Sequence, residues 1–282
     1  MNIIEQQIED YLHYCRVVRQ MTETTLRQKS CILGYFVRVT GVRELNDVTD
    51  EIFEWWVEYV LGIGVSSRTA NMYNSIVVAM VRYYRELGVK VPINLNLVTK
   101  LKETASERQY YSRSEIMRVV EVAEREVGLM IRIMFETGMR IAEVVGLRVE
   151  DFEGRRIRFV GKGRKMREVY ITTETLGMVD EYRIEYGIMG YLWSVNDGVL
   201  TCNGEPPTVN TVRKWLREAF AAAGFEGFYP HALRHSFATD LQIRGASVME
   251  IKEMIGHESV ATTERYLHGF DGRMRELFDK YR

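Results

Sequence analysis

The chain has 282 residues, of which 46% are hydrophobic and 27% charged, a composition typical of a globular protein with one or two domains. The N-terminal residues lack the pattern of a signal peptide, and no apolar run approaches the length of a membrane span. We therefore expect a cytoplasmic protein without membrane contact. The net charge of −1 argues mildly against a nucleic-acid partner, unless basic residues gather on one surface. The cysteines show no metal-ligand spacing and are predicted to be buried thiols: Cys15, Cys31 and Cys202.

The first hundred residues carry apolar side chains at helical spacing in four segments, which predicts a bundle of about four helices. These segments are residues 3–18, 25–39, 50–62 and 67–88. The last of them ends at Gly88, a suitable helix C-cap. The aromatic side chains of this region are expected to pack in the core or between helices: Trp55, Trp56, Tyr59, Tyr73, Tyr83 and Tyr84.

Weak periodicity and turn-forming residues then predict a linker at residues 98–110, between a helical domain at 1–97 and a second domain at 111–282. The second domain begins with Ser-x-x-Glu at Ser112, the pattern of a capping box. We expect one helix from there through Glu126 and another ending near Gly138.

The pattern changes to alternation after Gly154. Residues 155–160 and 167–171 flank a glycine-rich turn and predict a β-hairpin. Residues 155–167 include seven basic side chains and no acidic one. On charge alone, two interpretations are about equally supported: a solvated hairpin, and a basic hairpin that contacts a polyanion.

Helical patterns return at residues 174–187 and 209–224, the latter with Thr208 as N-cap and Gly224 as C-cap, and continue in short pieces beyond His231. The predicted fold class is mainly α with a small β-hairpin or sheet.

The stretch HALRHSFATD carries the first candidate site. His231 and His235 lie four residues apart and could ligate a metal, but nothing in the spacing supplies the further ligands that zinc requires. His231 and Arg234 lie at i and i+3 near a helix start after Pro230, which suits an anion. Taken alone, the motif equally describes a capping histidine beside a surface arginine.

Two further stretches carry candidate residues. TGMRIAEVVGL places Arg140 at a short helix start, where it binds an anion or forms a structural ion pair with Glu143. IGHESVATTERY places His257 directly after Gly256 and Tyr266 nine residues later. On their own, Gly256 and His257 equally fit a helix C-cap, and Tyr266 equally fits an ordinary position of an amphipathic helix.

The order of these stretches resembles the tyrosine recombinases, also called the phage integrase family, and most closely their archaeal and bacterial Xer-type members. The first box of the family is similar to ETGMRIAEVVGL, its hairpin lysine to the lysine in VGKGRKMREV, and its second box to HALRHSFAT. Its last element resembles MIGHESVATTERY, with Ile255 in place of the usual leucine. The catalytic residues that this resemblance implies are Arg140, Lys162, His231, Arg234, His257 and Tyr266.

The resemblance implies a helical core-binding domain and a mixed α+β catalytic domain that clamp double-stranded DNA at inverted-repeat recombination sites. Tyr266 would attack a phosphodiester, with His231 as base and Lys162 as acid, while two arginines and His257 stabilise the transition state. No metal, ATP or other cofactor is expected. Four protomers would pass through a Holliday junction. Residues 271–282 would form a helix that is exchanged between protomers or packs on its own domain.

The resemblance implies resolution of chromosome or plasmid dimers. An integrase of a virus or mobile element, a type IB topoisomerase and a DNA-binding protein without catalysis are the alternatives. Residues 1–105 contain 12 basic and 12 acidic side chains, and the remainder contains 26 and 27. We therefore expect one basic, DNA-facing surface, an acidic opposite surface and salt-sensitive binding. His235 and Glu143 are assigned to structure, and His268 to the surroundings of the site.

Overall fold

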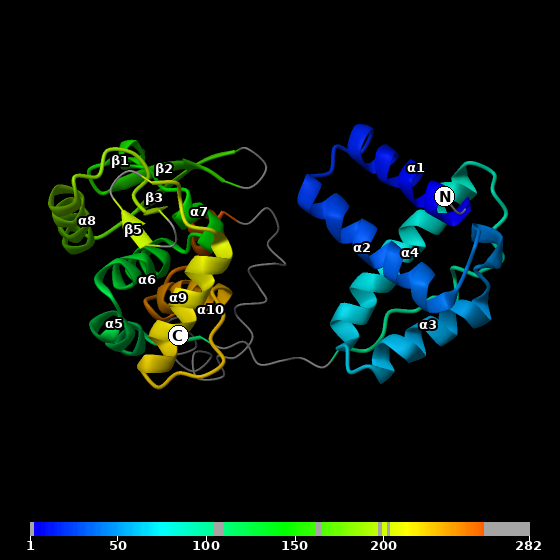
Figure 1. Ribbon diagram of the computed structural model, residues 1–282. Coiled ribbons are helices and arrows are strands. Elements are labelled where there is room, and N and C mark those ends of the chain that lie inside the picture. Colours follow the sequence, from blue (N-terminus) through cyan, green and yellow to red (C-terminus); the bar gives the residue numbers. More distant parts are fainter. Residues whose placement is uncertain (1–2, 104–109, 162–164, 197–198, 202–203, 257–282) are drawn as a thin grey trace. The chain divides into compact units, whose positions relative to one another are not determined.

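The computed structural model describes residues 3–103, 110–161, 165–196, 199–201 and 204–256. The chain divides into two units, Met1–Ser106 and Glu107–Arg282 (Figure 1). The described residues are mainly helical, with one small antiparallel sheet of three strands and a two-stranded ribbon. The predicted fold class is therefore confirmed. None of the described helices is long and apolar enough to cross a membrane.

The described part of the first unit contains the four predicted helices, α1 (Ile3–Val17), α2 (Glu23–Thr40), α3 (Asp50–Gly62) and α4 (Ser67–Glu86). A 3-10 turn, η1 (Leu45–Asp47), connects α2 to α3. Three of the helices begin at a hydroxyl residue whose side chain accepts a hydrogen bond from the backbone three residues later: Thr22, Thr49 and Ser66. These caps satisfy N–H groups that the helices themselves leave without partners.

The core of the first unit is centred on Trp56, which is fully buried and donates from Nε1 to Oδ1 of Asn74 at 3.0 Å. Tyr84 is also buried. Trp55 and Tyr59 are 44% and 37% exposed, so neither lies in the core. The Tyr59 ring lies 6.4 Å from that of Tyr35 on α2, which agrees with the predicted packing between helices. The buried positions of α3 are Phe53, Trp56 and Val60. At 100° per residue, position 55 points away from this buried stripe and position 59 lies at its edge.

The exposure of the cysteines likewise depends on the face of the helix on which each one lies. Cys15 is buried, as predicted, whereas Cys31 is exposed because it lies outside the buried stripe of α2. Cys202 lies outside the described residues.

In the second unit, α6 (Arg125–Thr137) is the central helix and packs against α5 (Arg113–Val122), α8 (Thr173–Tyr186), α9 (Val209–Ala222) and α10 (His231–Ile243). Nearly every side chain of α6 is buried. The capping box at Ser112 is confirmed, since Glu115 Oε2 accepts from the Ser112 backbone N–H at 2.7 Å. The predicted end of α5 at Glu126 is wrong, because the chain becomes extended at Ala123 and a new helix starts at Arg125.

The sheet consists of β1 (Phe152–Glu153), β2 (Arg156–Val160) and β3 (Met166–Tyr170), paired in that order. A 3-10 turn, η2 (Val149–Asp151), precedes it. Ile157 lies opposite Val169, and both side chains are buried in the core of the unit. The predicted hairpin is thus confirmed. The ribbon of β4 (Ser194–Asn196) and β5 (Val199–Thr201) was not predicted, because three-residue strands are too short to show alternation.

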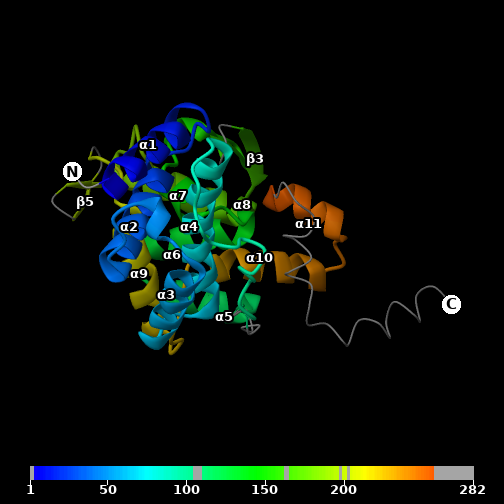
Figure 2. The same cartoon turned by 90° about the vertical axis from the view of Figure 1, so that its right-hand side faces the viewer.

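Three short features complete the second unit. Helix α6 ends at Gly138, whose φ is +62°, and the five-residue helix α7 (Ile141–Val145) follows. Helix α11 (Val248–Ile255) packs on α10 and ends at Gly256, with φ of +70° (Figure 2). Positive φ values suit glycine, and here they turn the chain sharply at two helix ends. The predicted helix at residues 271–282 lies outside the described residues.

Candidate active site

Arg140 lies between the turn at Gly138 and the start of α7, and Glu143 fixes it there. The Glu143 carboxylate accepts from the backbone N–H of Arg140 at 2.8 Å and from Arg140 Nη1 at 2.9 Å. The Glu143 side chain is only 8% exposed, whereas that of Arg140 is 32% exposed. The expected ion pair is therefore present, and it leaves part of the guanidinium open to a ligand.

Arg234, on α10, is almost completely buried, with 1% exposure. Its Nη1 donates to the carbonyl of Gly138, and its Nη2 donates to the carbonyl of Ile255 at 2.8 Å. These two carbonyls belong to the ends of α6 and α11, where the helices leave carbonyl groups without internal partners. One guanidinium thereby joins two helix ends and is fixed in orientation by both.

Arg140 and Arg234 meet at a cavity of about 330 Å³, which His231 also lines. The structure thus brings together three of the predicted site residues, from the start of α7 and the first turn of α10. Two polar side chains of the lining were not predicted as site residues, Arg213 of α9 and Tyr229. Lys162, His257 and Tyr266 lie outside the described residues.

The described lining of this cavity contains three arginines and a histidine, and no acidic side chain. Guanidinium groups bind phosphate and carboxylate oxygens through paired hydrogen bonds. The cavity is therefore built for an oxyanion. Arg213 could not be recognised from the sequence, because its distance from the other arginines along the chain gives no periodic signal.

The two histidines of the possible metal pair lie in different surroundings. His231 lines the cavity, whereas His235 is buried, with its ring 6.0 Å from that of Tyr110 and Nδ1 3.2 Å from Oγ1 of Thr239. Within the described parts of the chain, no group of His, Cys, Asp and Glu side chains has the arrangement of a metal site. The structural assignment of His235 agrees with this packing.

The hairpin is less uniformly basic than its sequence indicates. Arg156 and Arg158 form ion pairs with Glu153 and Glu168, which flank them on β1 and β3. These pairs are exposed and contribute little to stability, so a phosphate can displace the carboxylates at small cost. Arg167 turns inward instead, and its Nη1 lies 3.4 Å from Glu143.

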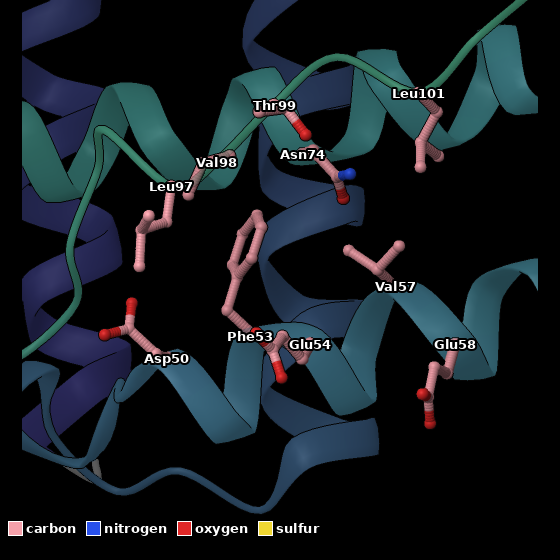
Figure 3. Close-up of a pocket in the computed structure, with 10 residues that line it drawn as sticks. All are labelled: Asp50, Phe53, Glu54, Val57, Glu58, Asn74, Leu97, Val98, Thr99 and Leu101. Atoms are coloured by element: carbon pink, nitrogen blue, oxygen red, sulfur yellow. The ribbon is translucent and has the colours of Figure 1, made fainter.

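A second cavity, of about 310 Å³, lies in the first unit between α3, α4 and residues 97–101. Figure 3 shows Phe53 and Val57 on one side of it and Leu97, Val98 and Leu101 on the other, with acidic side chains along α3. These carboxylates are Asp50, Glu54 and Glu58. They would repel a phosphate, so the cavity beside Arg140 is the candidate active site.

Comparison with known proteins identifies the family of the chain. The profile of the phage integrase family matches residues 107–273, which include the candidate catalytic positions. The chain therefore belongs to the phage integrase family, the tyrosine recombinases, which are enzymes that cut and rejoin DNA. It is 25% identical over 292 aligned residues to the tyrosine recombinase XerD of Listeria monocytogenes serotype 4b (strain F2365), with 97% of each chain covered.

Solved structures share the fold. One is the XerH site-specific recombinase bound to a palindromic difH substrate in a post-cleavage complex, with a TM-score of 0.74 and 22% identity. That match covers 98% of this chain and 84% of XerH. Another is a lambda integrase tetramer bound to a Holliday junction, with a TM-score of 0.75 and 17% identity, covering 94% of this chain and 77% of the integrase.

Proposed function

We propose that the chain is an Xer-type site-specific recombinase that resolves chromosome or plasmid dimers through a covalent 3′-phosphotyrosine. The observation that carries this proposal is the convergence of Arg140, His231 and Arg234 on one cavity without an acidic lining residue among those described. The coverage of XerD along nearly its whole length supports the Xer-type role.

The chemistry follows from the side-chain types. The Tyr266 oxygen forms a bond to the scissile phosphorus while the bond from phosphorus to the 5′ oxygen breaks. Because a free tyrosine has a pKa of about 10, the proton needs an acceptor, and His231 takes this role. Lys162 gives a proton to the leaving 5′ oxygen. In the second half of the reaction, the 5′-hydroxyl of the partner duplex attacks the phosphotyrosine.

The two arginines act on the charge that develops at the non-bridging oxygens, together with His257. Arg140 is held by Glu143, and Arg234 by the carbonyls of Gly138 and Ile255. Donors that are already oriented need no reorganisation during the reaction, and this preorganisation is a major source of rate enhancement. The positive charge of the arginines supplies the stabilisation that a metal ion provides in other phosphoryl-transfer enzymes.

The proposed partner is double-stranded DNA with an inverted-repeat recombination site. The first unit serves as the core-binding domain, and four protomers act together at two sites. A lambda integrase tetramer on a Holliday junction supports this assembly by likeness of fold. Because phosphate contacts release counterions, the logarithm of the association constant is expected to fall linearly with the logarithm of the salt concentration. An affinity that does not change with salt contradicts this proposal.

The decisive experiment is the trapping of the covalent intermediate on nicked suicide substrates, without metal or ATP. Wild type is expected to form a protein–DNA adduct that resists denaturation, and Tyr266→Phe is expected to form none. If no candidate site gives an adduct, or Tyr266→Phe gives the same adduct, the catalytic assignment is wrong.

The same assay separates the possible roles. Substrates from chromosomal dimer-resolution sites and from element-borne attachment sites are tested side by side. Reaction at chromosomal sites supports the Xer-type role, and reaction confined to element-borne sites identifies an integrase. Relaxation of supercoiled DNA without strand exchange identifies a topoisomerase.

A further inference from the structure

Arg167 is the inward-facing arginine of the hairpin. Its side chain is only 13% exposed, and on β3 it points to the same side as the buried Val169. Its neighbours Met166 and Glu168 are exposed. Its guanidinium carbon lies 5.3 Å from the centre of the Phe159 ring, on the opposing strand. Because burial of a charge is costly unless the charge is paired, an arginine that faces the interior is expected to have partners there.

The partners of Arg167 belong to the candidate active site. Nη1 lies 3.4 Å from both carboxylate oxygens of Glu143, the residue that holds Arg140. Nη2 donates to the carbonyl of Ile255 at 2.5 Å, and that same oxygen accepts from Arg234. Arg167 therefore contacts both the carboxylate that holds Arg140 and a carbonyl that holds Arg234.

Two glycines leave the room that this side chain occupies. A Cβ atom at Gly256 would lie 2.5 Å from Nε of Arg167, and one at Gly161 would lie 2.7 Å from its Cδ. Gly161 directly precedes Lys162, and Gly256 directly precedes His257. The two glycines that lie against Arg167 are therefore those that precede two of the proposed catalytic residues in the sequence.

The electrostatics agree with this geometry. Burial lowers the pKa of Arg167, the Glu143 carboxylate opposes that effect, and the charge of Arg140 adds to it. An arginine nevertheless stays charged under all ordinary conditions. The Glu143 carboxylate therefore lies between two permanent cations and holds both.

We propose that Arg167 is a positioning residue for DNA cleavage, an inference that rests on the proposed recombinase function. Through Glu143 it fixes Arg140, and through the carbonyl of Ile255 it fixes the end of α11 against Arg234. Because it extends from the strand that follows Lys162, it also ties the hairpin to both arginines. Arg167 itself faces protein groups and does not touch the scissile phosphate.

The test measures the single-turnover rate of suicide-substrate cleavage and, separately, the affinity for intact DNA. Arg167→Met keeps the volume of the side chain but loses every donor. It is expected to slow cleavage on the order of 100-fold, as misplacement of catalytic groups does, with an unchanged dissociation constant. Cleavage at the wild-type rate by a folded Arg167→Met protein overturns the proposal, as does an equal loss of DNA affinity.

Arg132→Met is the matched control. Arg132 also forms a buried pair, with Glu136 at 3.5 Å and side-chain exposures of 11% and 6%, but it lies within α6 and outside the cavity lining. It is expected to lower the thermal midpoint while the folded protein cleaves at the wild-type rate. Equal slowing by both variants would mean that loss of any buried ion pair slows cleavage, which overturns the specific role of Arg167.

Two further measurements keep the test decisive. If Arg167→Met does not fold, Arg167→Lys retains the charge but cannot bind Glu143 and Ile255 at once, and it is expected to show a smaller loss of rate. In a Glu143→Gln background, Arg167→Met is expected to cost much less than in wild type, because the two residues act through each other. Additive losses contradict the coupling. Failure of wild type to form an adduct instead refutes the recombinase function itself.

Discussion

Arg167 and Arg234 donate hydrogen bonds to one carbonyl oxygen, that of Ile255, at 2.5 and 2.8 Å. This oxygen lies at the last residue of α11, where a helix carries partial negative charge. Two guanidinium groups from β3 and α10 therefore converge on one helix end. The rigidity of the proposed phosphate-binding arginines depends on this shared acceptor as much as on their own helices.

Arg234→Lys tests this dependence. A lysine has no planar fork, so it cannot reach the carbonyls of Gly138 and Ile255 together while it binds phosphate. Cleavage is expected to fall by about 100- to 1000-fold, the usual cost of losing one transition-state donor. Suicide-substrate kinetics measure it, with Arg183→Lys on α8 as a control that cleaves normally. A cleavage rate close to that of wild type would remove Arg234 from the catalytic set.

Gly138→Ala is predicted to destabilise the second unit and to slow cleavage. The new Cβ would lie 2.5 Å from Cδ1 of Phe237, on the helix that carries Arg234, and the φ of +62° is itself unfavourable for alanine. Gly187→Ala is the matched control, since its φ is +61° but nothing lies within 4 Å of the new Cβ. Thermal unfolding of both variants separates the steric clash from the backbone cost. Equal losses would mean that Phe237 moves away freely.

Tyr111→Phe is predicted to reduce the loss of unfolding free energy that occurs as the pH rises above about 10. Burial raises the pKa of Tyr111 to about 12, so the folded state keeps its proton where the unfolded chain loses it. Ionisation of this group therefore does not affect stability below about pH 10, and it lowers stability as pH rises from there towards 12. Denaturant titrations at pH 8 to 12 measure it. Tyr170→Phe, at an exposed position, should leave the curve of wild type unchanged.

The same substitution is expected to be neutral or slightly stabilising at neutral pH. No hydrogen-bond partner of the buried Tyr111 hydroxyl is present among the described residues, and removing a desolvated group without a partner relieves a cost of about 1 kcal/mol. A clear loss of stability at pH 7 would indicate that the hydroxyl has a partner.

Ser236→Ala is predicted to destabilise the second unit by about 1 to 3 kcal/mol, because it leaves a buried N–H group without an acceptor. The Ser236 hydroxyl accepts from the Tyr111 backbone at 2.7 Å and donates to the Ala232 carbonyl at 2.9 Å. Ser114→Ala removes an exposed hydroxyl of the same unit and should change stability by less than about 0.5 kcal/mol. Equal effects in chemical denaturation would show that the buried bond contributes nothing specific.

Features set by neighbours in sequence were predictable. The capping box at Ser112, the N-cap at Thr208 and the pairing of Arg140 with Glu143 each involve residues three positions apart, and the structure contains all three. The family boxes placed Arg140, His231 and Arg234 in one site, and the described cavity brings those side chains together.

Features set by distant contacts were not predictable. The seven basic residues of the hairpin looked equivalent, whereas the Arg167 side chain is only 13% exposed and that of Arg158 is 46% exposed, beside Glu153 and Glu168. The face of a strand that becomes buried depends on what packs there, here Glu143 and the end of α11. The position of Arg213 in the cavity lining was also unpredictable, because α9 meets α7 only in the folded unit.

The carboxylates along α3, at Asp50, Glu54 and Glu58, have a consequence for how DNA is first encountered. Their repulsion acts over roughly a Debye length of about 8 Å at physiological salt, well before any contact is made. A DNA duplex that diffuses towards this side of the first unit is therefore repelled. Neutralising these three side chains removes that repulsion, so it should speed the association of the protein with DNA.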